Sequence, residues 1–178
     1  MNLTKTICFC LLLCSSCAKA PAPKPAVPPE ASPVAVPAIS RPVSSADVVK
    51  ASSPDTEIAA GGKAEAQVVI SVSPGYHVNA NPATFPYLIA TAVEAGPGKG
   101  ISVGKPVYPA AMQKTFSFEK HPLSVYEGTA TIKLPIQSAG KTEKGSQSIP
   151  LKVRVQACDD AACYAPATLD LSLNVTVK

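Results

Sequence analysis

Apolar and polar residues alternate in several short stretches between about residue 45 and the end of the chain. The apolar positions recur at every second residue in four of these stretches: residues 66–72, 123–125, 151–157 and 169–177. Residues 129–134 add a further strand-like stretch, and turn signals lie between the stretches at residues 73–75, 95–98, 127–128 and 139–141. Because short alternating stretches separated by turns are typical of antiparallel strands, the pattern predicts an all-β sandwich.

The first seventeen residues predict an export signal. Lys5 precedes an apolar run, residues 7–14, that is too short to span a bilayer. Small residues before Cys17 resemble a bacterial lipoprotein signal, in which Cys17 becomes the lipidated first residue. Alternatively, cleavage after Ala20 releases a chain that begins at Pro21. We expect a lipid-anchored periplasmic protein, and a soluble periplasmic or secreted chain is the alternative.

Residues 18–45 predict a tether, and residues 46–178 predict one folded domain. Eight of the nineteen prolines lie between residues 21 and 42. Proline lacks a backbone donor and fixes φ, so this segment suits neither a helix nor a central strand. It is expected to form a semi-rigid spacer of about 3.1 Å per residue. A tail without a mechanical role is the alternative.

Two cysteines separated by four residues, Cys158 and Cys163, carry the candidate chemistry of the domain. The other four cysteines lie within the first seventeen residues. A disulfide that closes so short a loop adds only about 2 kcal/mol in the chain-entropy model, against nearly 5 kcal/mol for a loop of roughly a hundred residues. Such a bridge is a weak structural link that opens and closes easily, which favours thiol–disulfide exchange.

The alternation of residues 151–157 predicts where this pair lies. Its polar residues face solvent, and Cys158 continues their series, so Cys158 is expected on the solvent side. Residues 159–162 then form a hairpin loop, and Cys158 and Cys163 face each other with Cα atoms about 4.5–5.5 Å apart. This separation suits a disulfide. We therefore expect both sulfurs near the surface at a hairpin end.

Four segments, residues 75–82, 107–109, 125–128 and 156–166, follow one another in a characteristic order. In order and spacing they resemble the N-terminal periplasmic domain of the DsbD thiol:disulfide interchange proteins, and the cysteine segment is the specific one. The resemblance covers residues 55–178. It implies an immunoglobulin-like antiparallel β-sandwich with the redox cysteine pair at a hairpin end.

The resemblance also implies an electron relay in the bacterial periplasm. A thioredoxin-like donor linked to a membrane thiol-reductant transporter reduces the disulfide, and the dithiol reduces disulfide isomerases or thioredoxin-like proteins of cytochrome c maturation. The chain is then a thiol–disulfide oxidoreductase module without a cofactor, and Cys163 forms the mixed disulfide with partners. Full-length relatives continue into a membrane domain and a thioredoxin-like domain, so this chain is expected to use a separate membrane protein.

The same resemblance implies the walls and the cap of the site. Its expected wall and cap residues are His77, Asn79, Phe118, Asp159, Asp160 and Tyr164. The capping loop of the family corresponds to residues 115–122, where Phe118, or alternatively Phe116, covers the sulfurs. His77 and Asn79 stand where enterobacterial relatives have tyrosines, and His77 can hydrogen-bond or protonate a thiol near neutral pH.

The two aspartates of the cysteine loop have two interpretations. As negative neighbours, Asp159 and Asp160 disfavour a thiolate and so slow stray oxidation. Alternatively, they are present because hairpin loops favour aspartate for turn geometry alone. Both can hold together.

Other functions are weighed against the relay. A structural or adhesive β-sandwich lipoprotein with an inert disulfide is the main alternative. Cys158, Cys163 and His77 could in principle bind Cu(I) or zinc, but their spacing is not a metal signature, and we expect neither a metal nor a cofactor. The net charge of +4 is spread over tether and domain, so no nucleic-acid partner is expected.

Overall fold

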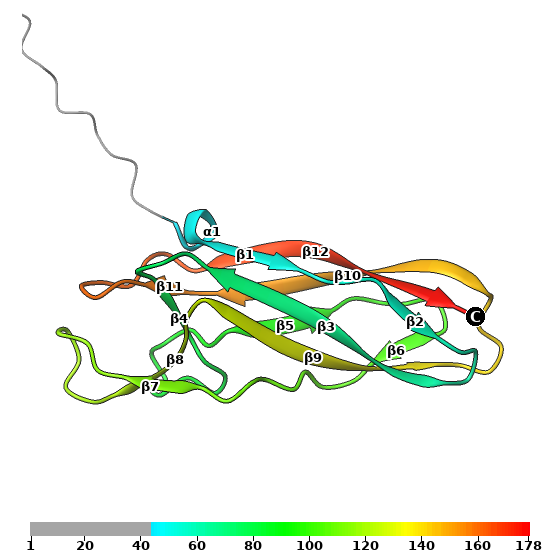
Figure 1. Ribbon diagram of the computed structural model, residues 1–178, viewed down its shortest axis with the longest axis horizontal. Helices are drawn as coiled ribbons and strands as arrows, with labels where there is room; N and C mark the ends of the chain where they lie inside the picture. The colour runs from blue at the N-terminus through cyan, green and yellow to red at the C-terminus, as the bar shows by residue number, and fades with distance from the viewer. Residues whose placement is uncertain (1–43) are drawn as a thin grey trace, which may run out of the picture. The chain divides into compact units, whose positions relative to one another are not determined.

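The computed structural model describes residues 44–178, which form an all-β domain with one short helical turn (Figure 1). The predicted export signal at residues 1–17, its Cys17 and nearly all of the predicted tether lie outside the described residues. The prediction of an antiparallel β-sandwich for the domain is confirmed.

Two four-stranded sheets carry the core. The first sheet contains, in spatial order, β1 (Val49–Ser52), β3 (Lys63–Val72), β9 (Thr129–Ser138) and β6 (Ile101–Val103). The second contains, in spatial order, β2 (Thr56–Ile58), β12 (Ala167–Val177), β10 (Gly145–Val155) and β5 (Ala92–Ala95). All pairs within these sheets are antiparallel except β2 and β12, which run parallel.

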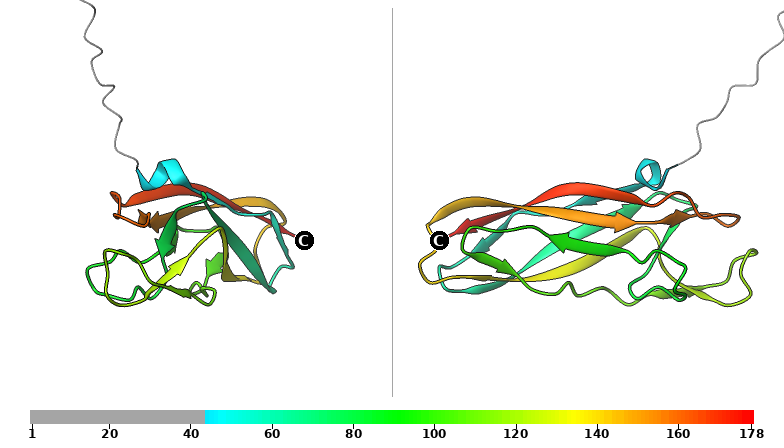
Figure 2. Two further views of the ribbon diagram at one scale, coloured as in Figure 1. Left: turned by 60° about the vertical axis from the view of Figure 1, so that its left-hand side comes forward. Right: turned by 180° about the vertical axis from the view of Figure 1, so that it is seen from behind.

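A third, smaller sheet lies at one end of this sandwich. Its strands, in spatial order, are β11 (Ala157–Cys158), β4 (His77–Asn79), β8 (Leu123–Tyr126) and β7 (Met112–Lys114). Figures 1 and 2 show these short strands at the end opposite the C-terminus, where β10 runs on into β11. The cysteine loop that follows β11 therefore lies at this end of the domain.

The core is built from the alternation that the sequence displays. The inward residues of β3 are buried, from Ala66 to Val72, while Gln67 and Ser71 between them are exposed. In β12 the inward series is fully buried only from Leu173 onward, because Leu169 and Leu171 lie half-exposed. The buried faces of the two sheets join in one cluster, so apolar burial holds the sandwich together.

The helical turn α1 (Ser45–Val48) fastens the start of the domain to the cysteine end. Ser44 caps the turn, with Asp47 completing a capping box. The buried Ser45 hydroxyl donates to the Ala165 carbonyl (2.6 Å) and accepts from the Ala157 amide (2.9 Å). One side chain thus joins the chain segments on both sides of the cysteine loop.

Candidate thiol–disulfide site

Cys158 and Cys163 form a disulfide with an S–S distance of 2.01 Å. The two residues are antiparallel neighbours across the four-residue loop 159–162, as the sequence predicts. Their Cα atoms lie 3.9 Å apart, closer than the expected range. The loop closes independently of the sulfurs, because the Asp159 amide donates to the Ala162 carbonyl (2.9 Å) and the Tyr164 amide donates to the Ala157 carbonyl (2.8 Å).

The two sulfur-bearing residues differ in exposure. Cys158 is fully buried (0% exposed), whereas Cys163 is exposed. The prediction that Cys158 faces solvent is therefore wrong. β10 ends at Val155, and after Gln156 the chain enters a different sheet as β11. Both residues of β11, Ala157 and Cys158, are buried, so the alternation breaks at Cys158. Only the Cys163 side of the bond is open to an incoming group.

Gln156 organises the point where the chain changes sheets. Its side-chain carbonyl accepts hydrogen bonds from the Ile89 amide (3.1 Å) and from Asn79 Nδ2 (3.2 Å). Its side-chain amide donates to the Tyr164 carbonyl (3.3 Å). Gln156 therefore holds the loop that follows β4 against the strand segment on the far side of the cysteines.

Asp159 shapes the cysteine loop in the way the turn interpretation predicts. Its Oδ1 accepts hydrogen bonds from the Ala161 and Ala162 amides (2.8 Å each), and the Tyr164 hydroxyl donates to its Oδ2. The Tyr164 hydrogen bond and these two amides lower the pKa of Asp159. The same Asp159 carboxylate raises the pKa of Tyr164 to about 12. Tyr164 also packs at a tilt against Tyr76, with ring centroids 5.9 Å apart.

His77 lies directly beside the inner cysteine. It is the antiparallel partner of Cys158 in the pairing of β4 with β11, and it is 1% exposed. Its ring stacks on Phe116 with centroids 4.0 Å apart. Burial lowers the pKa of the His77 imidazole below its ordinary value of 6.5, and the positive charge of Lys114 acts in the same direction. His77 therefore favours the neutral form in the disulfide-bonded protein.

Asn79 lies two residues further along β4, away from the sulfurs. Its Nδ2 donates to the Ile89 carbonyl (3.2 Å) as well as to Gln156, and its backbone carbonyl accepts from Thr91. Asn79 is thus a buried support for Gln156, and these hydrogen bonds do not involve the cysteines.

Phe118 and Cys163 line the same surface hollow. The hollow measures about 430 Å³. Its lining residues are Tyr87, Leu88, Phe118, Glu119, Leu123, Gln156, Ala161 and Cys163. Phe118 is 41% exposed and stacks on the buried Phe116, with centroids 5.4 Å apart. The segment that the sequence predicts as a cap therefore contributes two aromatic rings to the site. Phe116 stacks on His77, the neighbour of Cys158, and Phe118 lines the hollow beside Cys163.

Polar contacts hold this capping segment in place. The Ser117 hydroxyl donates to the Asp160 carbonyl (2.9 Å), which joins the segment to the cysteine loop. The Tyr87 hydroxyl donates to Glu119 Oε2 (2.9 Å), which joins it to the loop between β4 and β5. All of these groups lie near the surface, where single hydrogen bonds add only about 1 kcal/mol each. These polar contacts are therefore weak, and the buried Phe116 anchors the segment.

Sequence reasoning missed several residues of this site. Tyr87 and Leu88 lie in a loop without alternation, and the only signal for them is the aromatic-rich run of residues 85–88 outside the predicted strands. Gln156 looked like an ordinary solvent-facing strand residue. Its role depends on the change of sheet, which no local pattern displays.

Within residues 44–178, no cluster of three or more His, Cys, Asp or Glu side chains is arranged to hold a metal ion. The described helix is too short to cross a membrane.

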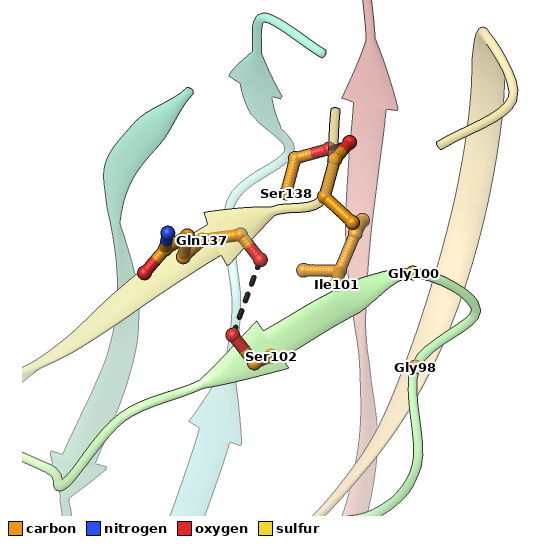
Figure 3. Close-up of a pocket in the computed structure, with 7 residues that line it drawn as sticks. Gly98, Gly100, Ile101, Ser102, Gln137 and Ser138 are labelled. Atoms are coloured by element: carbon orange, nitrogen blue, oxygen red, sulfur yellow. Dashed lines mark hydrogen bonds between the residues drawn. The ribbon is translucent and has the colours of Figure 1, made fainter. Parts of the chain in front are cut away.

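A second hollow, of about 450 Å³, lies at the other end of the domain, near the end of β9 (Figure 3). Its lining includes Gly98, Gly100, Ile101 and Gln137, and the Ser102 hydroxyl donates to the Gln137 carbonyl (3.3 Å). A Cβ atom at Gly98 would lie 2.7 Å from the Ile101 carbonyl oxygen, so glycine permits this close approach of two chain segments. The lining holds neither a cysteine nor a charged side chain.

The fold and the site together define a class, a β-sandwich domain with an asymmetric disulfide at one end. The chain belongs to the family described as "Thiol:disulfide interchange protein DsbD, N-terminal", whose family model matches residues 46–174. The family resemblance noted from the sequence is thereby confirmed, and with it the immunoglobulin-like sandwich.

Solved structures of related domains are similar at low sequence identity. The reduced N-terminal domain of Neisseria meningitidis DsbD is 17% identical, with 66% of this chain and 82% of that chain covered and a TM-score of 0.44. The N-terminal periplasmic domain of Proteus mirabilis ScsB is 12% identical, with 72% and 45% covered and a TM-score of 0.47. No curated protein sequence matches the chain. The family assignment rests on the family model.

Proposed function

We propose that this protein is a periplasmic thiol–disulfide interchange module that carries two electrons between thioredoxin-like proteins. The observation that carries the proposal is the asymmetry of the bond: Cys163 is exposed beside an apolar hollow, and Cys158 is buried behind it. An incoming thiolate therefore reaches Cys163 and not Cys158. Membership of the DsbD N-terminal family supports the same direction of attack.

In the proposed cycle the module is first reduced and then oxidised. A donor thiolate attacks Cys163 Sγ, a mixed disulfide forms, and the electron pair of the broken bond leaves on Cys158 Sγ. The donor's second thiol then resolves the mixed disulfide and leaves both module cysteines reduced. In the second half, the Cys163 thiolate attacks the disulfide of an acceptor, and Cys158 resolves that adduct.

We assign the donor to a thioredoxin-like protein linked to a membrane thiol-reductant transporter. The acceptors are periplasmic disulfide isomerases or the thioredoxin-like proteins of cytochrome c maturation. The hollow supports partners of this kind, because Tyr87, Leu88 and Phe118 offer an apolar surface around Cys163 on which the region surrounding a Cys-x-x-Cys motif can dock. Phe118 covers this surface between encounters and moves when a partner docks.

The predicted N-terminal segments extend the proposal to location. Lipidation of Cys17 places the module at a membrane surface, with residues 18–45 as the spacer that lets it reach partners. A Cys17→Ser variant should then move from the membrane fraction to the soluble periplasmic fraction. Unchanged fractionation would favour cleavage after Ala20 and a soluble module.

The proposal is tested by trapping the exchange intermediate. In a Cys158→Ala variant, the Cys163 thiol attacks an oxidised thioredoxin-like protein and no second cysteine resolves the adduct, so a mixed disulfide should accumulate. The matched control is Cys163→Ala, whose remaining thiol is the buried Cys158 and which should give little adduct. If no candidate partner forms an adduct, or if the control reacts equally well, the relay fails and an inert disulfide in a structural domain is the better interpretation.

A further inference from the structure

His77, Cys158 and Cys163 stand in one row across neighbouring backbone segments. His77 pairs with Cys158 across β4 and β11, and Cys158 pairs with Cys163 across the loop. Residues directly opposite each other in antiparallel pairs project to the same face of a sheet. The imidazole and the two sulfurs therefore share one face, with Cys158 in the middle.

The row runs from the interior of the domain to its surface. His77 and Cys158 are 1% and 0% exposed, while Cys163 is exposed. When an incoming thiolate attacks Cys163, the sulfur that leaves is the buried one. A thiolate without water around it is unfavourable unless a donor stabilises it.

The imidazole is the free donor at this place. Among residues 44–178, three buried side-chain atoms have no hydrogen-bond partner, namely His77 Nε2, Asn79 Oδ1 and Gln147 Oε1. The two oxygens can only accept, whereas the nitrogen donates in the imidazole tautomer that carries its proton on Nε2. Two other donors near the cysteines are already used: the Tyr164 hydroxyl donates to Asp159, and the Asp159 amide donates to Ala162.

The stacking of the ring leaves this nitrogen available. Phe116 covers one face of the imidazole, with an angle of 20° between the ring planes. The nitrogens lie on the edge of the ring, which this contact does not cover. Phe116 therefore fixes the plane of the ring without occupying its donor.

We propose that His77 Nε2 donates a hydrogen bond to the Cys158 thiolate that forms when the disulfide opens, and thereby stabilises the leaving group of the exchange. This inference rests on the proposed function. In the attack step, the bond from the partner sulfur to Cys163 Sγ forms and the Cys158–Cys163 bond breaks. The electron pair stays on Cys158 Sγ, and the His77 proton remains on Nε2 within the hydrogen bond.

Four charged groups face His77 and set the balance of this contact. Glu127, Asp160 and Asp159 raise the pKa of the imidazole, whereas Lys114 and, more strongly, burial lower it. Lys114 and Glu127 form an ion pair (2.5 Å), and Lys114 Nζ lies 5.4 Å from the centre of the Phe116 ring. A thiolate on Cys158 adds a further negative charge beside the ring, so the pKa of His77 should rise on reduction.

The test measures the Cys158 thiolate directly. In the chain from residue 18 onward, Cys163→Ser leaves Cys158 as the single cysteine, and its thiolate absorbance at 240 nm gives the ionisation midpoint. Replacing His77 by Phe keeps the stack on Phe116 and removes the donor. The midpoint should rise by about one pH unit or more, because a hydrogen bond to the charged form is lost. His77→Gln, which keeps an N–H donor, should recover part of the shift.

The matched control is His121→Phe, the same substitution at the chain's other histidine, which should leave the Cys158 midpoint unchanged. If a His77 variant does not fold, the unsubstituted chain decides the question. The NMR chemical shift of His77 Nε2 should then differ between its oxidised and reduced forms. An unchanged midpoint in the folded His77→Phe variant, or identical Nε2 shifts in both redox states, would overturn the inference. If the Cys158→Ala variant still traps an adduct through Cys163 in that case, the proposed relay function is retained and only the proposed His77 hydrogen bond is rejected.

Discussion

The reduced domain should remain folded, with a loss of only about 2 kcal/mol in the free energy of unfolding. The disulfide joins residues five positions apart, and the chain-entropy model gives about 2 kcal/mol for so short a loop. Since the free energy of unfolding of small domains is about 5–15 kcal/mol, this loss leaves most of the stability in place.

The loop itself supports the same expectation. Backbone hydrogen bonds of 2.9 Å and 2.8 Å close it on both sides of the cysteines, and Asp159 accepts from two further amides. Ser45 holds the flanking segments at Ala157 and Ala165. None of these contacts uses a sulfur atom, so the two thiols should stay close after reduction. A relay needs this property, because it works in both redox states.

Urea unfolding of the oxidised and the phosphine-reduced chain, followed by circular dichroism, measures the difference. Reduction is a cleaner change than Cys158→Ala, which also removes a buried side chain. The two curves should have similar slopes and midpoints that differ by the equivalent of about 2 kcal/mol. A reduced chain that is unfolded without urea, or that loses more than about 4 kcal/mol, would refute the reasoning and make the disulfide a structural link.

Four further predictions concern the walls and the cap of the site. The pKa of Asp159 is lower in the folded state than its ordinary value of 3.8. Its carboxylate therefore stabilises the fold at pH values above 3.8, and this contribution disappears as the pH falls through the folded-state pKa. Asp159→Asn should therefore flatten the acid limb of the stability profile. In an absorbance titration at 295 nm, the tyrosine that ionises near pH 12 should vanish in Tyr164→Phe, and its persistence would contradict the assigned hydrogen bond. Phe116→Ala should cost about 3–5 kcal/mol of stability because Phe116 is buried. Phe118→Ala should cost much less but speed reduction of the disulfide by a small thiol, and an unchanged rate would argue against a capping role.

The two large sheets could be predicted because apolar and polar residues alternate along their long strands. Residues such as Ala66, Ile132 and Val153 alternate with charged or polar neighbours, and their strands are ten or eleven residues long. The short strands could not be found in this way. Strand β4 is buried at all three of its positions and so has no alternation, and β11 contains two residues.

The disulfide chemistry of the site could be predicted from the sequence, but the burial of Cys158 could not. The spacing of Cys158 and Cys163 indicates a closable pair, and the pair is closed. The side on which Cys158 lies depends on Gln156, where the chain leaves one sheet for another under the control of contacts with Ile89 and Asn79. These contacts join residues far apart in the sequence, so a local period cannot display them.

The reduction potential of the Cys158–Cys163 disulfide tests the central claim most directly. Equilibration of the chain with a thioredoxin-like protein of known potential should give a value between about −180 and −270 mV, within reach of the partners of a relay. A value below about −300 mV, which is typical of structural disulfides, would contradict the account.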